Sequence, residues 1–401
     1  MFKMNSLVVA AVMAGVVLLA RASPAVAQEA GSRTEEHATA QQEKARALSP
    51  EKSVWLERQL LAIEQAGGFG VARGWLLTAG DIKRGSGLAL GPAYGKTFAS
   101  GLVVQAKAAY SIRSFKVAQV SLQSPPLAGD RLTFKGRVRW QDAPKVSFYG
   151  LAPGSTETRT FYSETAAEVS SDVMFRPVRI LRFGAGAGFE RFDTRTARGA
   201  SPSLSYLFDG VPGVGADPDY LHARASAAID ARDSEGYSRH GSLLRATLHD
   251  YRQQNSGPYS FQRVDGVAEQ YVPILHGNWV LYVGLHASTT TATSGHVVPF
   301  FLMPDVGGHD LRGFTTYRFR DRHSLLVTAE YRWYAQEFLE GAIFYDAGKA
   351  VPERSALDFR GLKSSVGAGI RLHGAQSALR LEVARSREGI RLLLKFSPVG
   401  G

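Results

Sequence analysis

The sequence predicts an all-β fold, a 16-stranded antiparallel transmembrane β-barrel. Three observations predict it. The N-terminus has the pattern of a secretory signal peptide, and from Phe69 onward runs of about ten residues alternate between apolar and polar side chains. Long connections between these runs also alternate with short ones. Outer-membrane barrels combine long external loops, short periplasmic turns and an even number of strands.

The first 27 residues predict export from the cytoplasm. Lys3 precedes the apolar run Leu7 to Ala20, and Ala25-Val26-Ala27 forms an A-x-A cleavage site, so we expect cleavage after Ala27. The run is too short for a membrane-spanning helix, which needs about 20 apolar residues. The chain has no Cys, which excludes disulfides, thiolate metal sites and thiol nucleophiles. An exported chain without Cys fits the periplasm or outer membrane of a Gram-negative cell.

A polar tail and one short helix are expected over residues 28–68, in the periplasm. The tail, Gln28 to Leu48, has no apolar period. Ser49 and Pro50 resemble the N-cap and first position of an amphipathic helix that ends near Gln65, before Gly67-Gly68. Its apolar side could lie on the membrane surface or against the barrel. A simple spacer is the alternative.

The barrel domain is expected to occupy residues 69–401. Leu325, for example, begins an apolar face that continues to Trp333, while the other face carries Glu330 and Arg332. Alternation alone also fits a soluble sandwich, but an Arg or Lys facing lipid would cost about 2–4 kcal/mol, and these charges stay on one face. The strands are expected near 70–80, 86–95, 101–112, 115–124, 131–142, 159–174, 178–191, 219–231, 241–252, 261–273, 277–289, 322–334, 338–348, 362–373, 376–385 and 388–397.

Loop lengths favour a membrane barrel over a sandwich. Long connections follow the fifth, seventh, eleventh and thirteenth strands, at 143–158, 192–218, 290–321 and 349–361, and those between them are short. A soluble sandwich has no reason to keep alternate loops long, whereas a membrane barrel has. Aromatic residues near strand ends are candidates for interface girdles, or for ordinary packing: Tyr94, Trp140, Tyr271, Trp279, Trp333 and Tyr334.

The formal charge of +11 limits the kinds of partner that the protein is expected to bind. A basic chain fits nucleic acid, anionic lipid, an anion-lined pore or a solvated basic surface. Export makes nucleic acid the wrong partner. We therefore expect outer-membrane lipids and lipopolysaccharide around the barrel.

Three short motifs stand out. The loop before Leu325 carries Gly307-Gly308 and then Leu311-Arg312-Gly313-Phe314. The thirteenth strand carries Phe344-Tyr345-Asp346-Ala347-Gly348, whose alternate residues Phe344, Asp346 and Gly348 share one face. A third, Asp230 to Ser234, reads Asp-Ala-Arg-Asp-Ser before Gly241. Taken together, and in their order along the chain, the three motifs resemble those of the outer-membrane barrel superfamily of BamA/TamA insertases and bacterial surface antigens. The resemblance covers roughly residues 69–401.

That resemblance implies a sixth external loop folded into the lumen, with its Arg against acidic residues of the wall. A guanidinium in a narrow lumen also needs a carboxylate on physical grounds. We expect Asp346 to be the partner of Arg312, with Glu330 and Glu340 second in rank; Arg312 in a solvated loop is the alternative. Gly184, Gly186 and Gly188 are expected to give the folded loop room at the wall.

Two departures from the family bear on function. Its large members carry polypeptide-transport-associated (POTRA) modules before the barrel, and residues 28–68 have no room for one. The absence of these modules puts the handling of client proteins in doubt. The last strand, "GIRLLLKFSP", looks like a C-terminal signal for the barrel-assembly machinery, but it stops short of the chain's final residue.

The sequence gives no enzyme signature: it has no G-x-S-x-G elbow, H-E-x-x-H helix or Walker pattern. His309 beside Asp310 is interpreted as a loop hydrogen-bond pair, not a metal site, and no cofactor is expected. The leading hypothesis is insertion or transport of protein or lipid at the outer membrane, without catalysis. A passive channel and a structural surface antigen are the alternatives, and a soluble secreted β-enzyme is the remote one.

Overall fold

A computed structural model describes residues 74–398 of the chain except 200–202, 205–207, 236, 276–277, 337–338 and 374–376. The chain divides into two units, residues 1–56 and 57–401, and every described residue belongs to the second. The predicted signal peptide, polar tail and short helix lie outside the described residues.

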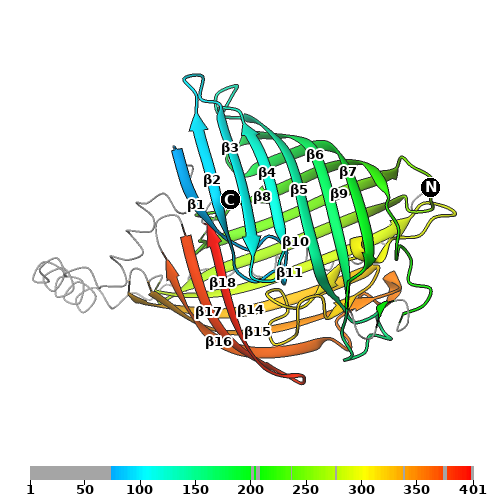
Figure 1. Ribbon diagram of the computed structural model, residues 1–401. Helices are drawn as coiled ribbons and strands as arrows, with labels where there is room; N and C mark the ends of the chain where they lie inside the picture. The colour runs from blue at the N-terminus through cyan, green and yellow to red at the C-terminus, as the bar shows by residue number, and fades with distance from the viewer. Residues whose placement is uncertain are drawn as a thin grey trace, which may run out of the picture. The chain divides into compact units, whose positions relative to one another are not determined.

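The described residues form one sixteen-stranded antiparallel sheet in which each strand pairs with the next along the chain (Figure 1). This confirms the predicted fold class. The strands of the sheet are β1 (Gly74–Gly80), β2 (Ala89–Thr97), β3 (Val103–Ser111), β4 (Lys116–Gln123), β5 (Leu132–Phe148), β6 (Thr160–Val178), β7 (Leu181–Thr196), β8 (Asp219–Asp230), β9 (Gly241–Gln253), β10 (Phe261–Ile274), β11 (Trp279–Ala292), β14 (His323–Gln336), β15 (Leu339–Val351), β16 (Lys363–His373), β17 (Ser377–Ser386) and β18 (Gly389–Pro398).

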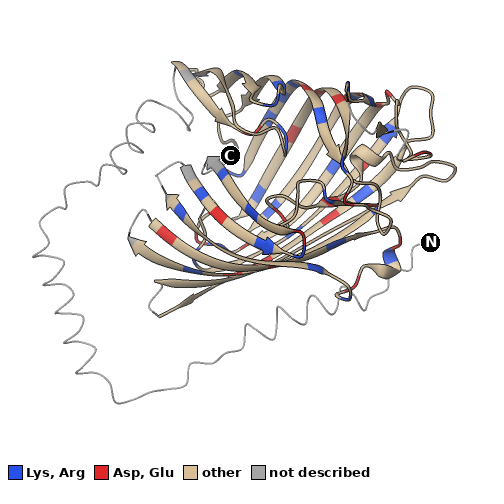
Figure 2. Cartoon of the chain, turned by 60° about the horizontal axis from the view of Figure 1, so that its bottom comes forward, with Lys and Arg blue, Asp and Glu red and all other residues tan. Residues whose placement is uncertain are grey.

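The sheet curls so that one face turns inward and the other outward. On β18 the outward residues Ile390, Leu392 and Leu394 are 71%, 70% and 63% exposed, while Leu393 between them is buried. Charged residues recur along the strands (Figure 2), and several of them, such as Asp346, Arg371 and Glu382, are buried inside the barrel. Apolar side chains therefore face lipid and polar ones line the lumen, as the alternation predicts.

The connections place the long loops at one end of the barrel, here called the long-loop end. The β5–β6, β7–β8, β11–β14 and β15–β16 connections lie there, and the opposite end has shorter turns. The largest differences from the predicted strands are at the ends of β5 and β7, which continue to Phe148 and Thr196, respectively. The extension of β5 shortens the predicted 143–158 loop, because residues read as loop stay in the ladder across a bulge between Ala143 and Val146.

The aromatic residues divide between the two faces. Trp279, Tyr331 and Trp333 form an outward group near the short turns, with ring centroids 5.2 and 6.3 Å apart along the series. Such a group suits the membrane interface. Tyr271 does not belong to this girdle, because its place in the alternation turns it inward. There it packs on Tyr282 and donates a hydrogen bond to Glu269 at 3.1 Å.

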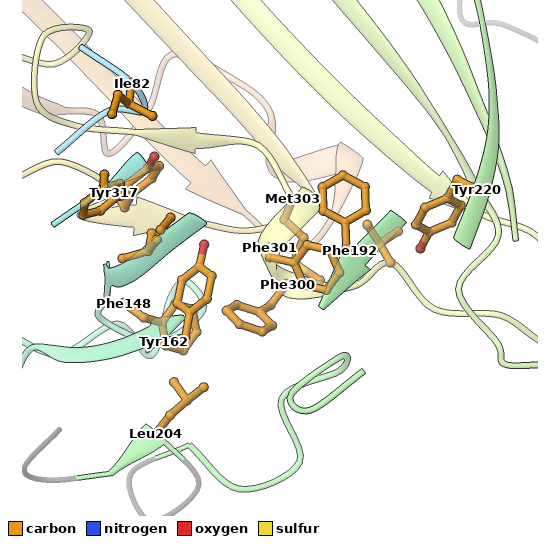
Figure 3. Packing of buried hydrophobic residues seen from close by; sticks show 14 of the residues in the cluster. Ile82, Phe148, Tyr162, Phe192, Leu204, Tyr220, Phe300, Phe301, Met303 and Tyr317 are labelled. Atoms are coloured by element: carbon orange, nitrogen blue, oxygen red, sulfur yellow. The ribbon is translucent and has the colours of Figure 1, made fainter. Parts of the chain in front are cut away.

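The main apolar core lies inside the barrel at the long-loop end (Figure 3). Phe300, Phe301 and Met303 of the β11–β14 loop pack against wall residues such as Tyr162 and Phe192. Phe300 meets the ring of Tyr162 edge-on at 4.8 Å. Aromatic side chains of the wall and of the loop thus pack together at this end. No helix of the described residues is long and apolar enough to cross a membrane.

Candidate functional site

The β11–β14 loop folds back into the lumen. Within it a 3-10 helix, η1 (Phe300–Leu302), precedes a two-stranded ribbon of β12 (Asp305–Val306) and β13 (Phe319–Arg320). The backbone conformation after β12 requires the Gly-Gly pair. Gly307 and Gly308 have positive φ, and a Cβ on Gly307 would stand 2.2 Å from the carbonyl oxygen of Thr315.

Arg312 lies at the innermost part of this loop and is buried, with 4% of its surface exposed. Its Nε and Nη2 donate to the two carboxylate oxygens of Asp346 at 2.7 and 2.8 Å, and its backbone N–H also donates to Asp346 at 3.2 Å. The guanidinium stands 3.4 Å from the ring centroid of Phe344. The structure thus places Arg312 against Asp346 in bidentate geometry, with a cation–π contact beneath it.

A larger group of charges surrounds this pair, here called the ion cluster. Arg312 Nη1 also donates to Glu330 at 2.8 Å and to Glu382 at 3.1 Å. Arg371 Nη2 donates to the same two carboxylates at 2.8 and 3.0 Å. The ion cluster comprises Arg312 of the loop and Glu330, Arg332, Asp346, Arg371 and Glu382 of four neighbouring strands.

The ranking of acids expected from sequence needs correction. Glu330 contacts Arg312 directly, whereas Glu340 pairs with Arg371 at 3.4 Å. Sequence reasoning missed Glu382 and Arg371 as partners. Each occupies a position in its strand's alternation that faces the lumen. Only the pairing of β15, β16 and β17 brings the two residues beside Arg312.

The other motif residues shape the pocket for the loop. Leu311 and Phe314 are buried, and Phe314 packs edge-on against Phe319 at 5.3 Å. A Cβ on Gly313 would be 2.9 Å from Ser365 of the wall, whereas one on Gly348 would be 3.0 Å from the Leu325 carbonyl oxygen within the wall itself. Glycine at position 313 lets the loop lie directly on the wall.

Further arginines fix the rest of the loop. Arg84 of the β1–β2 turn pairs with Asp305 at 2.6 Å and with Asp310 at 2.5 Å. Arg318 donates to Glu388 at 2.7 Å, and the buried Arg320 to the Tyr162 hydroxyl at 3.2 Å. The sequence suggested a hydrogen bond between Asp310 and its neighbour His309. In the structure Asp310 pairs with Arg84 instead. Among the described residues, His309 Nδ1 has no hydrogen-bond partner, and burial lowers the pKa of its ring.

The glycines of β7 serve a different purpose from the one expected. A Cβ on Gly186 would stand 2.2 Å from an Asp172 oxygen and 2.9 Å from Arg224 Nε. Asp172 and Arg224 form an ion pair across β6, β7 and β8. Gly186 thus makes room for a pair within the wall and not for the folded loop.

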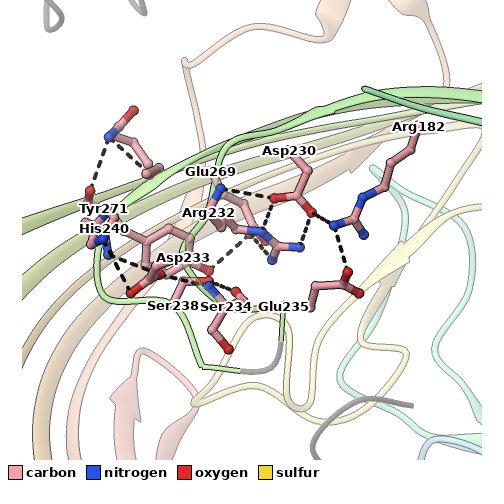
Figure 4. A network of polar contacts seen from close by, with 12 residues as sticks. Arg182, Asp230, Arg232, Asp233, Ser234, Glu235, Ser238, His240, Glu269 and Tyr271 are labelled. Carbon is pink, nitrogen blue, oxygen red and sulfur yellow. Dashed lines mark hydrogen bonds and ion pairs between the residues drawn. The ribbon is translucent and has the colours of Figure 1, made fainter. Parts of the chain in front are cut away.

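The Asp230–Ser234 motif orders the turn between β8 and β9 (Figure 4). Arg232 Nε and Nη2 donate to the two oxygens of Asp230, both at 2.9 Å. Asp233 accepts hydrogen bonds from the backbone of Ser234 and Arg239, both at 3.0 Å. This is a structural role, because the charges close their own turn.

A cavity of about 540 Å³ lies where the two ends of the sheet approach, beside the end of β1 and the start of β18. The described residues of β1 pair only with β2, and those of β18 only with β17. These two free strand edges are here called the seam, and the cavity the seam cavity. Both faces of β18 line it, through Arg391 and Leu393 inward and Leu392 and Leu394 outward. In the part of the chain that the structure describes, no group of three or more His, Cys, Asp or Glu is arranged to hold a metal ion.

Residues 100–389, which include the ion cluster and the folded loop, match the model of the Omp85 superfamily domain. The chain belongs to the Omp85 superfamily. It is an outer-membrane barrel of the insertase and translocase type, and members of this superfamily are non-enzymatic insertases and transporters. No curated protein matches the chain.

Solved structures with the same fold include BamA from Haemophilus ducreyi lacking POTRA domains 1–3, with TM-score 0.60 at 14% identity over 81% of this chain and 69% of that one. CdiB from Acinetobacter baumannii gives TM-score 0.50 at 12% identity, and CdiB from Escherichia coli 0.53 at 9%. These matches cover 81% and 80% of this Omp85 chain, which spans only 58% and 61% of the two CdiB chains. At such identities the likeness shows the fold alone.

Proposed function

We propose that this Omp85 barrel inserts or transports protein at the outer membrane through the seam, without catalysis, while the β11–β14 loop keeps the lumen closed. One observation carries the proposal. The lumen holds a loop fixed at a buried ion cluster, whereas the sheet has a seam whose strand edges are unpaired in the described residues. Unpaired strand edges present free N–H and C=O groups, which bind an added strand readily.

In this proposal residues 69–401 form the barrel, the long loops are external and the N-terminus is periplasmic. Arg312, Gly313 and Phe314, with Gly307, Gly308 and Leu311, hold the loop against Phe344, Asp346, Gly348 and Glu330. Partners are outer-membrane lipids and lipopolysaccharide, the barrel-assembly machinery that inserts the chain itself, and client proteins. A lipid cargo is the second candidate, because both faces of β18 line the seam cavity. A passive porin is disfavoured by the aromatic side chains that pack together at the long-loop end.

Depletion of the protein, followed by an inventory of outer-membrane proteins and lipids, tests the proposal. Selective loss of particular proteins supports insertion, and altered lipid asymmetry without protein loss supports lipid transport. An unchanged inventory would overturn both and leave the channel or the surface antigen.

The seam itself is tested by cross-linking, which the absence of Cys makes simple. Asp81→Cys with Arg391→Cys places one thiol on each side of the seam cavity. Bridging them with a bis-maleimide should abolish the function found by depletion. The control is Val383→Cys with Leu392→Cys, which are register partners on β17 and β18 and are already joined. Full function after bridging the first pair would exclude a moving seam.

A further inference from the structure

The seam cavity has a strongly basic lining. Arg113, Lys145, Arg159 and Arg391 line it, and among the described residues none of the four has a carboxylate within ion-pair distance. Asp81 lines it as well, while Arg84 is already paired with Asp305 and Asp310. The lining therefore carries a surplus of positive charge that the protein itself does not balance.

Three residues that line the seam cavity each carry a buried polar atom without a partner. Arg391 Nε, His309 Nδ1 and Thr315 Oγ1 are buried, and none has a hydrogen-bond partner among the described residues. All three residues line the seam cavity. A buried polar atom without a partner is costly, and a turn of its side chain toward the cavity would let a bound ligand or water remove that cost.

The remaining lining is apolar and continues to the lipid-facing surface. Leu392 and Leu394 are lining residues on the outer face of β18, and Ile112 and Leu88, 77% and 50% exposed, line the same cavity. Since inward and outward residues of β18 both contribute, the cavity extends past the free edge of that strand. It therefore joins a basic interior to the apolar surface that lipid covers.

We propose that the seam cavity binds a lipid with a phosphate headgroup. Arg391, Lys145 and Arg159 hold the phosphate by charge-assisted hydrogen bonds, and an acyl chain runs out over Leu392 and Leu394. A volume of about 540 Å³ suits a headgroup and the first part of its chains. The proposal goes beyond insertion or transport, since it assigns a resident lipid and needs no client.

The test uses the full-length protein in phosphatidylcholine nanodiscs doped with a photoactivatable phosphatidylglycerol that carries its reactive group on the acyl chain. Mass spectrometry of the labelled peptides should place the adducts on the segments around Ile112 and Leu392–Leu394. Unlabelled phosphatidylglycerol should compete. Competition by inorganic phosphate or glycerol phosphate at the same level would instead identify a site for free phosphate and overturn the lipid.

Arg159→Gln with Arg391→Gln should lower the affinity measured by this labelling about a hundredfold, because each of the two charge-assisted contacts to the phosphate contributes about a factor of ten. The matched control is Lys135→Gln with Arg245→Gln, which removes two charges from a separate cavity of about 670 Å³ in the lumen. Retained heat-modifiable migration on gels verifies that both variants fold. Equal labelling of both variants, or equal labelling by a phosphatidylcholine probe, would overturn the proposal. Such a failure would leave the depletion and cross-linking results unaffected, so the two proposals can fail separately.

Discussion

Replacing Arg312 by Ala is the sharpest test of the folded loop. The substitution removes four side-chain hydrogen bonds to Asp346, Glu330 and Glu382, all between 2.7 and 3.1 Å. Glu330 and Glu382 would still accept hydrogen bonds from Arg371. Asp346 is left in a different position: it is fully buried and would keep only the Thr328 side chain and the backbone N–H of residue 312 as hydrogen-bond donors. The variant therefore leaves one carboxylate largely unpaired.

Breaking a buried pair in this way costs about 3–5 kcal/mol. Docking of the loop should weaken by that amount, which is a factor of about 100 to several thousand in its equilibrium constant. Asp346→Ala should act similarly, and the double variant should be less than additively worse, with a coupling of about 0.5–3 kcal/mol. Glu330→Ala, which sequence reasoning ranked lower, should be as severe, because it accepts from Arg312, Arg332 and Arg371.

Trypsin provides the assay. Arg318 and Arg320 are 3% and 1% exposed in the folded loop, so the enzyme reaches them only when the loop leaves the lumen. Cleavage after these residues should be slow in the native protein and fast in Arg312→Ala, with Arg312→Lys between them, since Lys keeps the charge without the bidentate geometry. If Arg312→Ala is cut no faster than the native chain, the ion cluster does not hold the loop.

Three other outcomes are expected. The mature chain should fractionate with the outer membrane and migrate faster on gels before boiling than after; release by osmotic shock would contradict the barrel. In planar bilayers it should give small, flickering currents that grow when residues 300–318 are deleted, because Phe300, Phe301 and Phe314 lie buried in the lumen; large steady steps from the intact protein would favour a porin. Burial and, after it, the charge of Lys395 lower the pKa of His309 below 6.5. The carboxylates of Asp81, Asp310 and Glu382 raise this pKa, but their effect is smaller. The released loop binds the proton more readily, so trypsin sensitivity should rise as the pH falls below about 6.5 and His309→Asn should remove this step; a native response unchanged by the substitution would exclude His309.

Much of the fold could be predicted because its signals are local. Period-two alternation on β14 and β18 defines two faces from neighbouring residues alone, and loop lengths define the two ends. The predicted end of β5 was wrong because a bulge extends a ladder without leaving a signal in the pattern. Tyr271 illustrates a related limit: its place in the alternation decided its face, although its position near a strand end favoured the girdle.

The site was less accessible to the sequence. The Arg312–Asp346 contact was proposed from a motif and from the need of a guanidinium for a carboxylate. Glu382 and Arg371 reach Arg312 through the registers of three strand pairs, and no spacing along the chain encodes that. The packing of the aromatic group around Phe300 could have been predicted from one feature of the sequence, the apolar run Val297 to Met303 within an otherwise polar loop. An apolar run in a long loop is an indication that the loop packs on something.

The contacts that hold the loop differ in strength, and this difference bears on how the barrel can move. The buried ion cluster ties the loop to β14, β15, β16 and β17, where loss of one partner costs several kcal/mol. At the seam the loop meets the β1–β2 turn through Arg84, which pairs with the buried Asp305 and with Asp310; the Arg84–Asp310 pair is exposed on both sides, and such pairs contribute about 0–1 kcal/mol. β1 is also short, seven residues, and in the described residues pairs with β2 alone. In the proposed function, the seam therefore opens by movement of this short strand while the ion cluster keeps the loop in the lumen.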